Sequence, residues 1–202
     1  MSKDVLPSNV RVLSSPAFAA KLAILRDRSI KPRAVRKLTA ELSTILAAEA
    51  FSAGSTASKA ALIVVLRAGL AMQDPFLDQA PSDLDVFVYH LGLFRDTVTL
   101  EPVEYYNKLP TRDRSIKHAY IVDPLIATGG TAAATINILR SWGVEHITFL
   151  SILASRVGLE QVANTWPEGT DFLVGVVDED IDEKGYIVPG LGDIGDRLYR
   201  TK

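Results

Sequence analysis

The sequence contains no cysteine, and this absence excludes two kinds of chemistry. A chain without cysteine forms no disulfides and offers no thiolate as a nucleophile or metal ligand, and it fits a reducing compartment. Histidine is also scarce, because only His90, His118 and His146 occur and each stands alone. We interpret the three as surface or strand-end residues, and we do not expect a histidine metal site.

Long apolar runs and an excess of positive charge are missing as well. No apolar segment reaches the roughly 18 residues that a membrane helix requires, and residues 1–7 lack the basic-then-apolar order of a signal peptide. The formal net charge is −2, so no broad basic field favours nucleic acid. We therefore expect a cytoplasmic protein that has neither a membrane nor nucleic acid as a partner.

What the chain does contain is typical of one globular domain. Its 202 residues are 48% hydrophobic and 23% charged, which allows a substantial core and is neither disordered nor fibrous. Residues 1–59 carry two amphipathic helical patterns, 16–27 and 32–51, and end in a loop of small residues. Strand and helix patterns alternate over residues 60–177, and a glycine-rich tail occupies 178–202. This order predicts an α/β fold with a mainly parallel sheet flanked by helices.

The most informative stretch runs from His118 to Thr131, where a strand pattern passes through a loop of small residues into a helix. Residues 119–122 are apolar and suit a strand that is covered on both faces. Asp123 follows at the carboxyl end of this strand, where open α/β sheets bind ligands. The loop Thr128-Gly-Gly-Thr131 can present backbone N–H groups to an anion, at the positive end of the next helix.

This loop has the chemistry of a sugar-phosphate site. Asp123 can accept hydrogen bonds from sugar hydroxyls, while Thr128 and Thr131 can donate to a phosphate. No lysine follows the glycines, so the loop is not a Walker A motif, and it does not match the dinucleotide-binding pattern G-x-G-x-x-G. Spacing alone leaves a plain turn between strand and helix as the alternative.

Two arginines follow strand patterns and are expected at the same crevice. Arg67 comes directly after the apolar segment 60–66, and Arg95 follows the strand pattern 83–93. Guanidinium groups bind phosphate oxygens in a forked geometry, so two of them suit a pyrophosphate. An arginine that simply leaves the core at a strand end is the alternative for Arg67.

The remaining segments are less specific. The glycine-rich tail from Gly185 to Arg197 can offer backbone donors and acceptors to a planar ligand, or it is a terminal turn. We interpret the acidic run 178–183 as a solvated loop rather than a metal site. Segment 97–110 is interpreted as an excursion or hairpin outside the main sheet, in which Tyr105 and Tyr106 have packing roles. The alternative is that Glu104, Tyr105, Tyr106 and Lys108 line a site or an oligomer contact.

Four segments, taken in order, resemble the uracil phosphoribosyltransferases, a branch of the type I phosphoribosyltransferase family. They are residues 66–72, 92–110, 123–131 and 185–197. In particular, Asp123 is followed by proline rather than by a second acid, as in that branch. The resemblance implies the type I fold with added N-terminal helices and a C-terminal base-binding segment. It also implies transfer of phosphoribosyl from 5-phosphoribosyl 1-diphosphate (PRPP) to uracil, giving UMP and pyrophosphate.

The resemblance also assigns roles by matching position. The implied PRPP contacts are Arg67, Arg95, Asp193 and the loop Asp123-Pro124-Leu125-Ile126-Ala127-Thr128-Gly129-Gly130-Thr131. The implied uracil contacts, mostly through the backbone, are Ile187, Gly192, Asp193 and Ile194. Asp193 would also face the diphosphate, directly or through Mg²⁺ as cofactor. The catalytic set would be Asp123, Arg67, Arg95 and Asp193, in a homo-oligomer that is a dimer or a tetramer.

The chain departs from the family pattern at four places. A hairpin that many members carry is missing between Glu49 and Leu62, which puts in doubt any flap or subunit contact built there. Ile194 stands where the family has alanine and could narrow the base pocket, residues 154–158 replace an Ala-Pro-Glu-Gly-type segment, and Arg200 stands where glycine is usual. Two alternatives therefore stay open: a different base, or a regulatory nucleotide-binding protein that has lost turnover.

Overall fold

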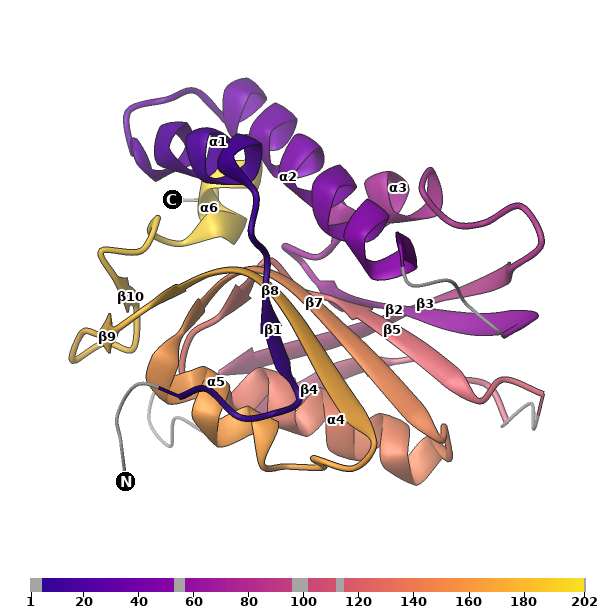
Figure 1. The fold of residues 1–202 in the computed structure, drawn as a ribbon. Helices are drawn as coiled ribbons and strands as arrows, with labels where there is room; N and C mark the ends of the chain where they lie inside the picture. Colours follow the sequence, from indigo (N-terminus) through magenta and orange to yellow (C-terminus); the bar gives the residue numbers. More distant parts are fainter. Residues whose placement is uncertain (1–4, 53–56, 96–101, 112–114, 202) are drawn as a thin grey trace.

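The computed structural model describes residues 5–52, 57–95, 102–111 and 115–201, and it shows a central sheet between two layers of helices (Figure 1). The strands of this sheet are β1 (Val10–Val12), β2 (Lys59–Leu66), β3 (Asp85–Arg95), β4 (Pro102–Asn107), β5 (His118–Val122), β6 (Leu125–Ile126), β7 (His146–Ser155) and β8 (Thr170–Asp178). Their order is β1-β8-β7-β5-β2-β3-β4, with the short β6 beside β7. Every pair is parallel except β3 with β4.

Helices cover both faces of the sheet. The helices are α1 (Pro16–Arg26), α2 (Pro32–Ser52), α3 (Leu70–Leu77), α4 (Gly130–Trp142), α5 (Arg156–Ala163) and α6 (Ile194–Tyr199). In Figure 1, α1, α2, α3 and α6 lie above the sheet, and α4 and α5 lie below it. A small antiparallel hairpin, β9 (Asp180–Ile181) with β10 (Ile187–Val188), projects beyond the end of β8. The described helices are all too short or too polar to cross a membrane.

The two faces of β2 explain why its sequence is apolar without interruption. Leu62 and Val64 belong to the core under α1 and α2, whereas Ile63 and Val65 belong to the core on the side of α4 and α5. A strand buried on both faces has no polar positions in its interior. The predicted strand over 60–66 is therefore confirmed.

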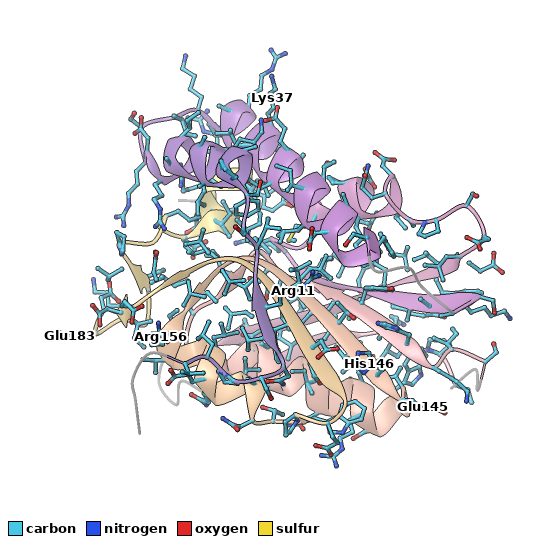
Figure 2. The ribbon with its side chains drawn as sticks, in the orientation of Figure 1. Arg11, Lys37, Glu145, His146, Arg156 and Glu183 are labelled. Atoms are coloured by element: carbon cyan, nitrogen blue, oxygen red, sulfur yellow. The ribbon has the colours of Figure 1, made fainter. Side chains whose placement is uncertain are left out.

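The N-terminal helices form where the sequence predicts them. The Ser15 side chain caps α1 by accepting a hydrogen bond from the Phe18 N–H at 3.2 Å, with Pro16 at the first helical position. Helix α2 extends over 21 residues and buries one stripe against the sheet. Its opposite face is solvated, and Lys37 projects away from the protein there (Figure 2). Elsewhere in the same view, Glu183 lies at the outer turn of the β9–β10 hairpin.

The strand order has a switch point between β2 and β5. After β2 the chain adds β3 and β4 on one side, and afterwards it adds β5, β7 and β8 on the other side. Helix α3, which follows β2, lies above the sheet, and α4, which follows β5, lies below it (Figure 1). The loops after β2 and β5 therefore diverge at the carboxyl ends of the strands, where such sheets bind ligands.

Several elements differ from the sequence-based expectation, and three of them bear on the sheet edges and the tail. Strand β1 was not predicted, because three residues carry too little pattern, yet it extends the sheet beside β8. Strand β4 belongs to the main sheet as its antiparallel edge, so the interpretation of an excursion outside the sheet was wrong; residues 97–101 of that segment lie outside the described residues. The tail contains the helix α6, whose six residues are too few to show periodicity.

Candidate active site

A pocket of about 680 Å³ opens at the carboxyl ends of β2, β3 and β5. Most of the residues assigned to PRPP or uracil line it: Arg67, Asp123, Leu125, Ile126, Ala127, Thr128, Gly129, Thr131, Gly192, Asp193 and Ile194. Pro124, Gly130 and Ile187 are not among the residues that line it. Arg95 is the last residue of β3, and its side chain lies outside the described part of the structure. The crevice predicted from strand ends is thus a real cavity that joins three distant segments.

Asp123 lies at the end of β5 with its side chain facing this pocket. Its N–H donates to the Leu150 carbonyl at 3.3 Å, and its carboxylate accepts a long hydrogen bond of 3.5 Å from the Leu125 N–H. Burial raises the pKa of Asp123 to about 7, and the Leu125 N–H opposes this shift only in part. A carboxyl group whose pKa lies near 7 can accept hydrogen bonds from sugar hydroxyls. In its ionised form it can also carry a negative charge beside a developing cation.

The loop after Asp123 is held by a backbone contact with α5. Gly129 has φ +86°, and a Cβ there would lie 2.6 Å from the Gly158 carbonyl oxygen. A Cβ at Gly158 would lie only 2.0 Å from the Ala127 carbonyl oxygen. Two glycines therefore let the loop and the first turn of α5 touch, which fixes the loop amides in front of α4.

Ser155 completes this support. Its hydroxyl donates to the Ala127 carbonyl at 2.5 Å and accepts from the Gly158 N–H at 2.9 Å, which caps α5. Segment 154–158, noted as a departure from the family pattern, thus packs behind the loop 127–131. The sequence signal that could have shown this role is a serine three residues before a glycine at a helix start.

Arg67 lies on the opposite wall, where β2 turns into α3. Its side chain is 50% exposed, and its guanidinium Nη2 is 3.5 Å from a carboxylate oxygen of Asp196. The turn passes close over β5, because a Cβ on Gly69 would lie 2.5 Å from the Val122 carbonyl oxygen. Glycine at this position keeps the Arg67 and Asp123 segments adjacent.

The tail is fixed to the end of α1 by two arginines. Arg26 makes a bidentate ion pair with Asp178, at 2.7 and 2.8 Å, and also donates to the Gly190 carbonyl. The Asp178 carboxylate in turn accepts from the Gly190 N–H at 2.9 Å. Arg197 donates to the carbonyls of Leu25, Leu191 and Asp27, each at 2.7 Å.

These contacts correct the interpretation of the acidic run 178–183. Asp178 is buried, with 7% of its side chain exposed, and it is ion-paired with Arg26. Asp180, Asp182 and Glu183 are exposed to solvent, and Asp180 belongs to the short strand β9 rather than to a loop. The run thus begins with an anchor for the tail, and only its remainder is solvated.

The side of the pocket formed by the tail differs in detail from the assignment. Ile194 is 4% exposed, packs into the core under α1 and α2, and also lines the pocket. Ile187 is buried in the same core, whereas its neighbour Tyr186, 39% exposed, lines the pocket. Tyr105 is 54% exposed and lines the pocket, and its ring packs against Phe94 with the centroids 6.1 Å apart, so it combines packing with a place in the pocket. Neighbouring Tyr106 is 41% exposed and lies against Gly92 of β3.

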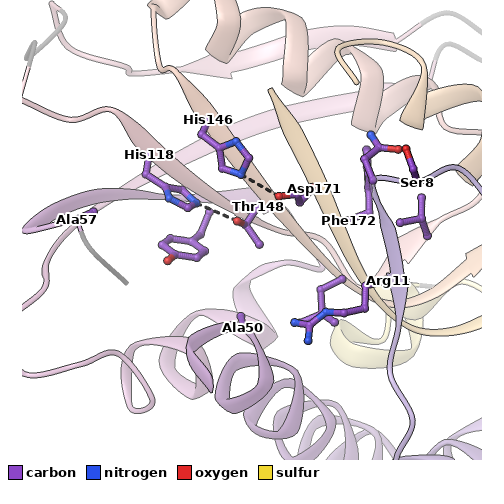
Figure 3. A pocket seen from close by; sticks show the side chains of 13 residues that line it. Ser8, Arg11, Ala50, Ala57, His118, His146, Thr148, Asp171 and Phe172 are labelled. Atoms are coloured by element: carbon purple, nitrogen blue, oxygen red, sulfur yellow. Dashed lines mark hydrogen bonds and ion pairs between the residues drawn. The ribbon is translucent and has the colours of Figure 1, made fainter. Parts of the chain in front are cut away.

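A second pocket, of about 480 Å³, lies at the opposite ends of the strands, between α2, β1 and the sheet (Figure 3). Its polar groups satisfy one another: His118 Nε2 is 2.9 Å from the Thr148 hydroxyl, and His146 Nε2 is 3.1 Å from Asp171. Both histidines begin strands, as expected. Among the described residues no group of three or more histidines and acids could hold a metal ion.

Comparison with known proteins decides the family. The family model for uracil phosphoribosyltransferase matches residues 53–201. The urg2 protein of Schizosaccharomyces pombe, whose name assigns it provisionally to that family, is 46% identical over 192 residues, covering 95% of this chain and 90% of the relative. The uracil phosphoribosyltransferase of Roseiflexus castenholzii is 38% identical over 209 residues, covering 95% of this chain and 98% of the relative. The chain belongs to the uracil phosphoribosyltransferase family.

Solved structures agree on the fold. A protein from Aquifex aeolicus has a TM-score of 0.85 at 30% identity, covering 96% of this chain and 99% of that one. The adenine phosphoribosyltransferase of Trypanosoma brucei has a TM-score of 0.57 at 15% identity, covering 88% of this chain and 87% of that one. This is a likeness of fold alone. The expected phosphoribosyltransferase fold is confirmed.

The comparisons also bear on the missing hairpin. The alignment with the R. castenholzii uracil phosphoribosyltransferase spans 209 positions, which exceeds the 202 residues of this chain, whereas the alignment with the S. pombe protein spans 192. The R. castenholzii enzyme thus carries residues that this family member lacks. The expected loss between Glu49 and Leu62 stays a prediction, because the alignment length does not locate these residues and residues 53–56 of that connection lie outside the described structure.

Proposed function

We propose that this protein transfers the phosphoribosyl group of PRPP to uracil and releases UMP and pyrophosphate, a reaction of pyrimidine salvage. The observation that carries the proposal is the single pocket in which Arg67, Asp123, the loop 127–131 and the tail 192–195 meet. Membership of the uracil phosphoribosyltransferase family supports uracil as the base. The side of the pocket formed by the loop suits the sugar phosphate, and the side formed by the tail suits the base.

We propose one task for each of these groups. The loop amides, with Thr128 and Thr131, bind the 5′-phosphate at the positive end of α4. Asp123 accepts hydrogen bonds from the ribose hydroxyls, and Arg67 and Arg95 bind the diphosphate. The base lies against the backbone of the tail at Gly192–Ile194.

The chemical step needs positioning and charge stabilisation more than covalent help. The bond between the anomeric carbon and pyrophosphate breaks, positive charge develops on the sugar, and the N1 atom of uracil forms the new bond and loses its proton. Arginines stabilise the charge on the leaving pyrophosphate, and the carboxylate of Asp123 stabilises the cationic sugar. Removal of one such contact is expected to cost about 2–4 kcal/mol in the transition state.

The site fits a magnesium ion that is held largely by the substrate. Asp193 offers one exposed carboxylate at the pocket, and Mg²⁺ typically takes one or two carboxylates together with substrate phosphates and water. When bound, Mg²⁺ would neutralise charge on the diphosphate. Asp193 would hold it from the side of the tail, so Mg²⁺ is proposed as the cofactor.

Assembly and location are part of the proposal. The edge strand β4 exposes Val103, Tyr105 and Tyr106, and an edge with apolar side chains favours pairing with another copy. We therefore propose a homo-oligomer, either a dimer or a tetramer, that functions in the cytoplasm. Sedimentation equilibrium would test the assembly, and a monomeric mass at micromolar concentration would contradict it.

The function is tested by incubating the protein with PRPP, Mg²⁺ and a panel of bases while pyrophosphate release is followed. Release with uracil and not with purines is the expected result. Release with another base would mean that Ile194 has changed the specificity. Binding of PRPP without release, whatever the base, would contradict the enzymatic proposal and favour a regulatory protein.

A further inference from the structure

We propose that Asp196 and Tyr199, both on α6, are positioning residues that set Arg67 for the diphosphate of PRPP. The inference deepens the proposed function and rests on it. Its basis is that one short helix contacts Arg67 at the side chain and at the backbone.

Two contacts join α6 to Arg67. Asp196 Oδ1 lies 3.5 Å from the guanidinium Nη2, and the Tyr199 hydroxyl donates to the Arg67 carbonyl at 3.2 Å. The Asp196 side chain is 15% exposed, whereas that of Arg67 is 50% exposed. The more buried side chain thus belongs to the helix, and the more exposed one lines the pocket.

Helix α6 is itself firmly placed. Leu198 is fully buried in the core under α1 and α2, and its carbonyl accepts a hydrogen bond from Arg36 of α2 at 2.8 Å. Thr201 donates to the Asp196 carboxylate at 2.5 Å. A carboxylate held in this way can fix a long side chain, which otherwise loses much rotational freedom when it binds a ligand.

The same helix also begins at the pocket. Asp193 caps α6 by accepting a hydrogen bond from the Asp196 N–H at 2.9 Å, and it lines the cavity. At Gly195, an ideal Cβ would lie 3.3 Å from Asp193 Oδ1 and 3.9 Å from Arg67 Nη2. One turn of helix therefore carries the acid that faces the diphosphate and the acid that orients Arg67.

The Arg67 guanidinium can contact Asp196 and a diphosphate at the same time. It carries five N–H donors in a planar fork, so a contact at Nη2 leaves other donors for phosphate oxygens. An arginine that is oriented before the ligand arrives loses less entropy on binding. The expected consequence of losing either contact is weaker PRPP binding with little change at the base.

The test measures the dissociation constant of PRPP with Mg²⁺ by calorimetry, together with kcat and both KM values, for Asp196→Asn and Tyr199→Phe. Each variant is expected to weaken PRPP binding about three- to tenfold, the range for one modest polar contact. The KM for uracil should change by less than about twofold. Tighter PRPP binding in Asp196→Asn would overturn the proposal, because the carboxylate would then act mainly by repelling the diphosphate.

Two further variants separate positioning from simple docking of the tail. Arg36→Met removes one contact that holds α6 without touching Arg67, so it should weaken PRPP binding less than Asp196→Asn does. In an Arg67→Lys background, Asp196→Asn should add no further loss, since its effect passes through the guanidinium. An equal loss in Arg36→Met, or full additivity with Arg67→Lys, would contradict the inference.

The binding measurement also separates this inference from the proposed function. If the wild-type protein binds PRPP but turns over no base, the enzymatic proposal fails and the binding series still reports on Asp196 and Tyr199. If the wild-type protein turns over uracil and both variants bind PRPP normally, only the positioning role fails.

Discussion

Asp123 combines a task in the pocket with an unfavourable environment for its charge. Burial raises its pKa from 3.8 to about 7, so the folded state binds this proton more tightly than the unfolded state does. Between about pH 4 and pH 7 the contribution of Asp123 to the free energy of unfolding must therefore fall as the pH rises. Above pH 7 the loss is complete.

We expect Asp123→Asn to remove this dependence, because an amide does not titrate. Urea unfolding of both proteins without ligand at pH 5, 6, 7 and 8 would show the variant gaining stability relative to the wild type as the pH rises. Asp85→Asn, at an exposed acid on the far end of β3, serves as the control and should follow the wild type. Parallel curves for wild type and Asp123→Asn would contradict the raised pKa.

Arg200 occupies a conformation that suits glycine. It follows α6 with φ +55° and is the one non-glycine residue with positive φ in the described structure. A side chain in this region costs about 1 kcal/mol. We expect Arg200→Gly to raise the free energy of unfolding by about 1 kcal/mol, measured by urea titration. Arg200→Ala, which loses the charge but keeps Cβ, should give no such gain; equal stability of the two variants would contradict the argument.

At the scale of elements, the loop 127–131, which we propose binds the 5′-phosphate, depends on α5. A Cβ at Gly158 would meet the Ala127 carbonyl at 2.0 Å, so either the loop or the first turn of α5 must move. We expect Gly158→Ala to raise the KM for PRPP by at least about tenfold, since a displacement of about 1 Å in a positioned site costs up to 100-fold. Steady-state kinetics would measure it. Val157→Ala, at the exposed neighbouring position, should behave as the wild type.

The tail depends on the ion pair between Arg26 and Asp178. Because both partners are largely buried, removal of one charge leaves the other without compensation. We expect Asp178→Asn to lower the free energy of unfolding by about 3 kcal/mol and to raise the KM for uracil more than that for PRPP. Thermal unfolding and steady-state kinetics would test this. The exposed Asp180→Asn is the control, and equal increases in both KM values would show that Asp178 does not act on the base half.

The sequence could predict the parts of this site that follow strands, and little of what connects them. Asp123 and Arg67 stand at abrupt changes from apolar to polar sequence, and the parallel strands bring such ends together. Contacts between distant segments leave a weaker signal. The closeness of Gly158 to the loop appears in the sequence only as one glycine, and Asp178 looked like any other acid in a solvated run.

At the scale of the whole molecule, the two ends of the sheet respond to pH in opposite directions. Burial, aided by His146, lowers the pKa of His118 to about 4, so the unfolded state binds this proton more tightly. The contribution of His118 to the free energy of unfolding is complete above about pH 6.5 and is lost as the pH falls toward 4. The contribution of Asp123 to the free energy of unfolding changes with pH in the opposite direction over the same range.

We therefore expect His118→Gln to resist acid better than the wild type does. From pH 7 to pH 5, the free energy of unfolding of the variant should rise relative to that of the wild type. Urea titration at each pH would follow this change. The double variant with Asp123→Asn should show the sum of the two single effects, because the residues lie at opposite ends of β5. A constant difference across this range would mean that His118 titrates normally.

The attachment of the tail to α1 has a consequence for the order in which the site is made. Arg197 binds the carbonyls of Leu25 and Asp27, which precede it by 172 and 170 positions. Contacts of such long sequence separation form late in folding, and during synthesis they must wait for the last segment to leave the ribosome. The part of the pocket made by β2, β5 and the loop before α4, which we propose for the sugar phosphate, is complete in the chain well before that point. We therefore expect a growing chain to form this part of the pocket first, and the part that we propose for the base last.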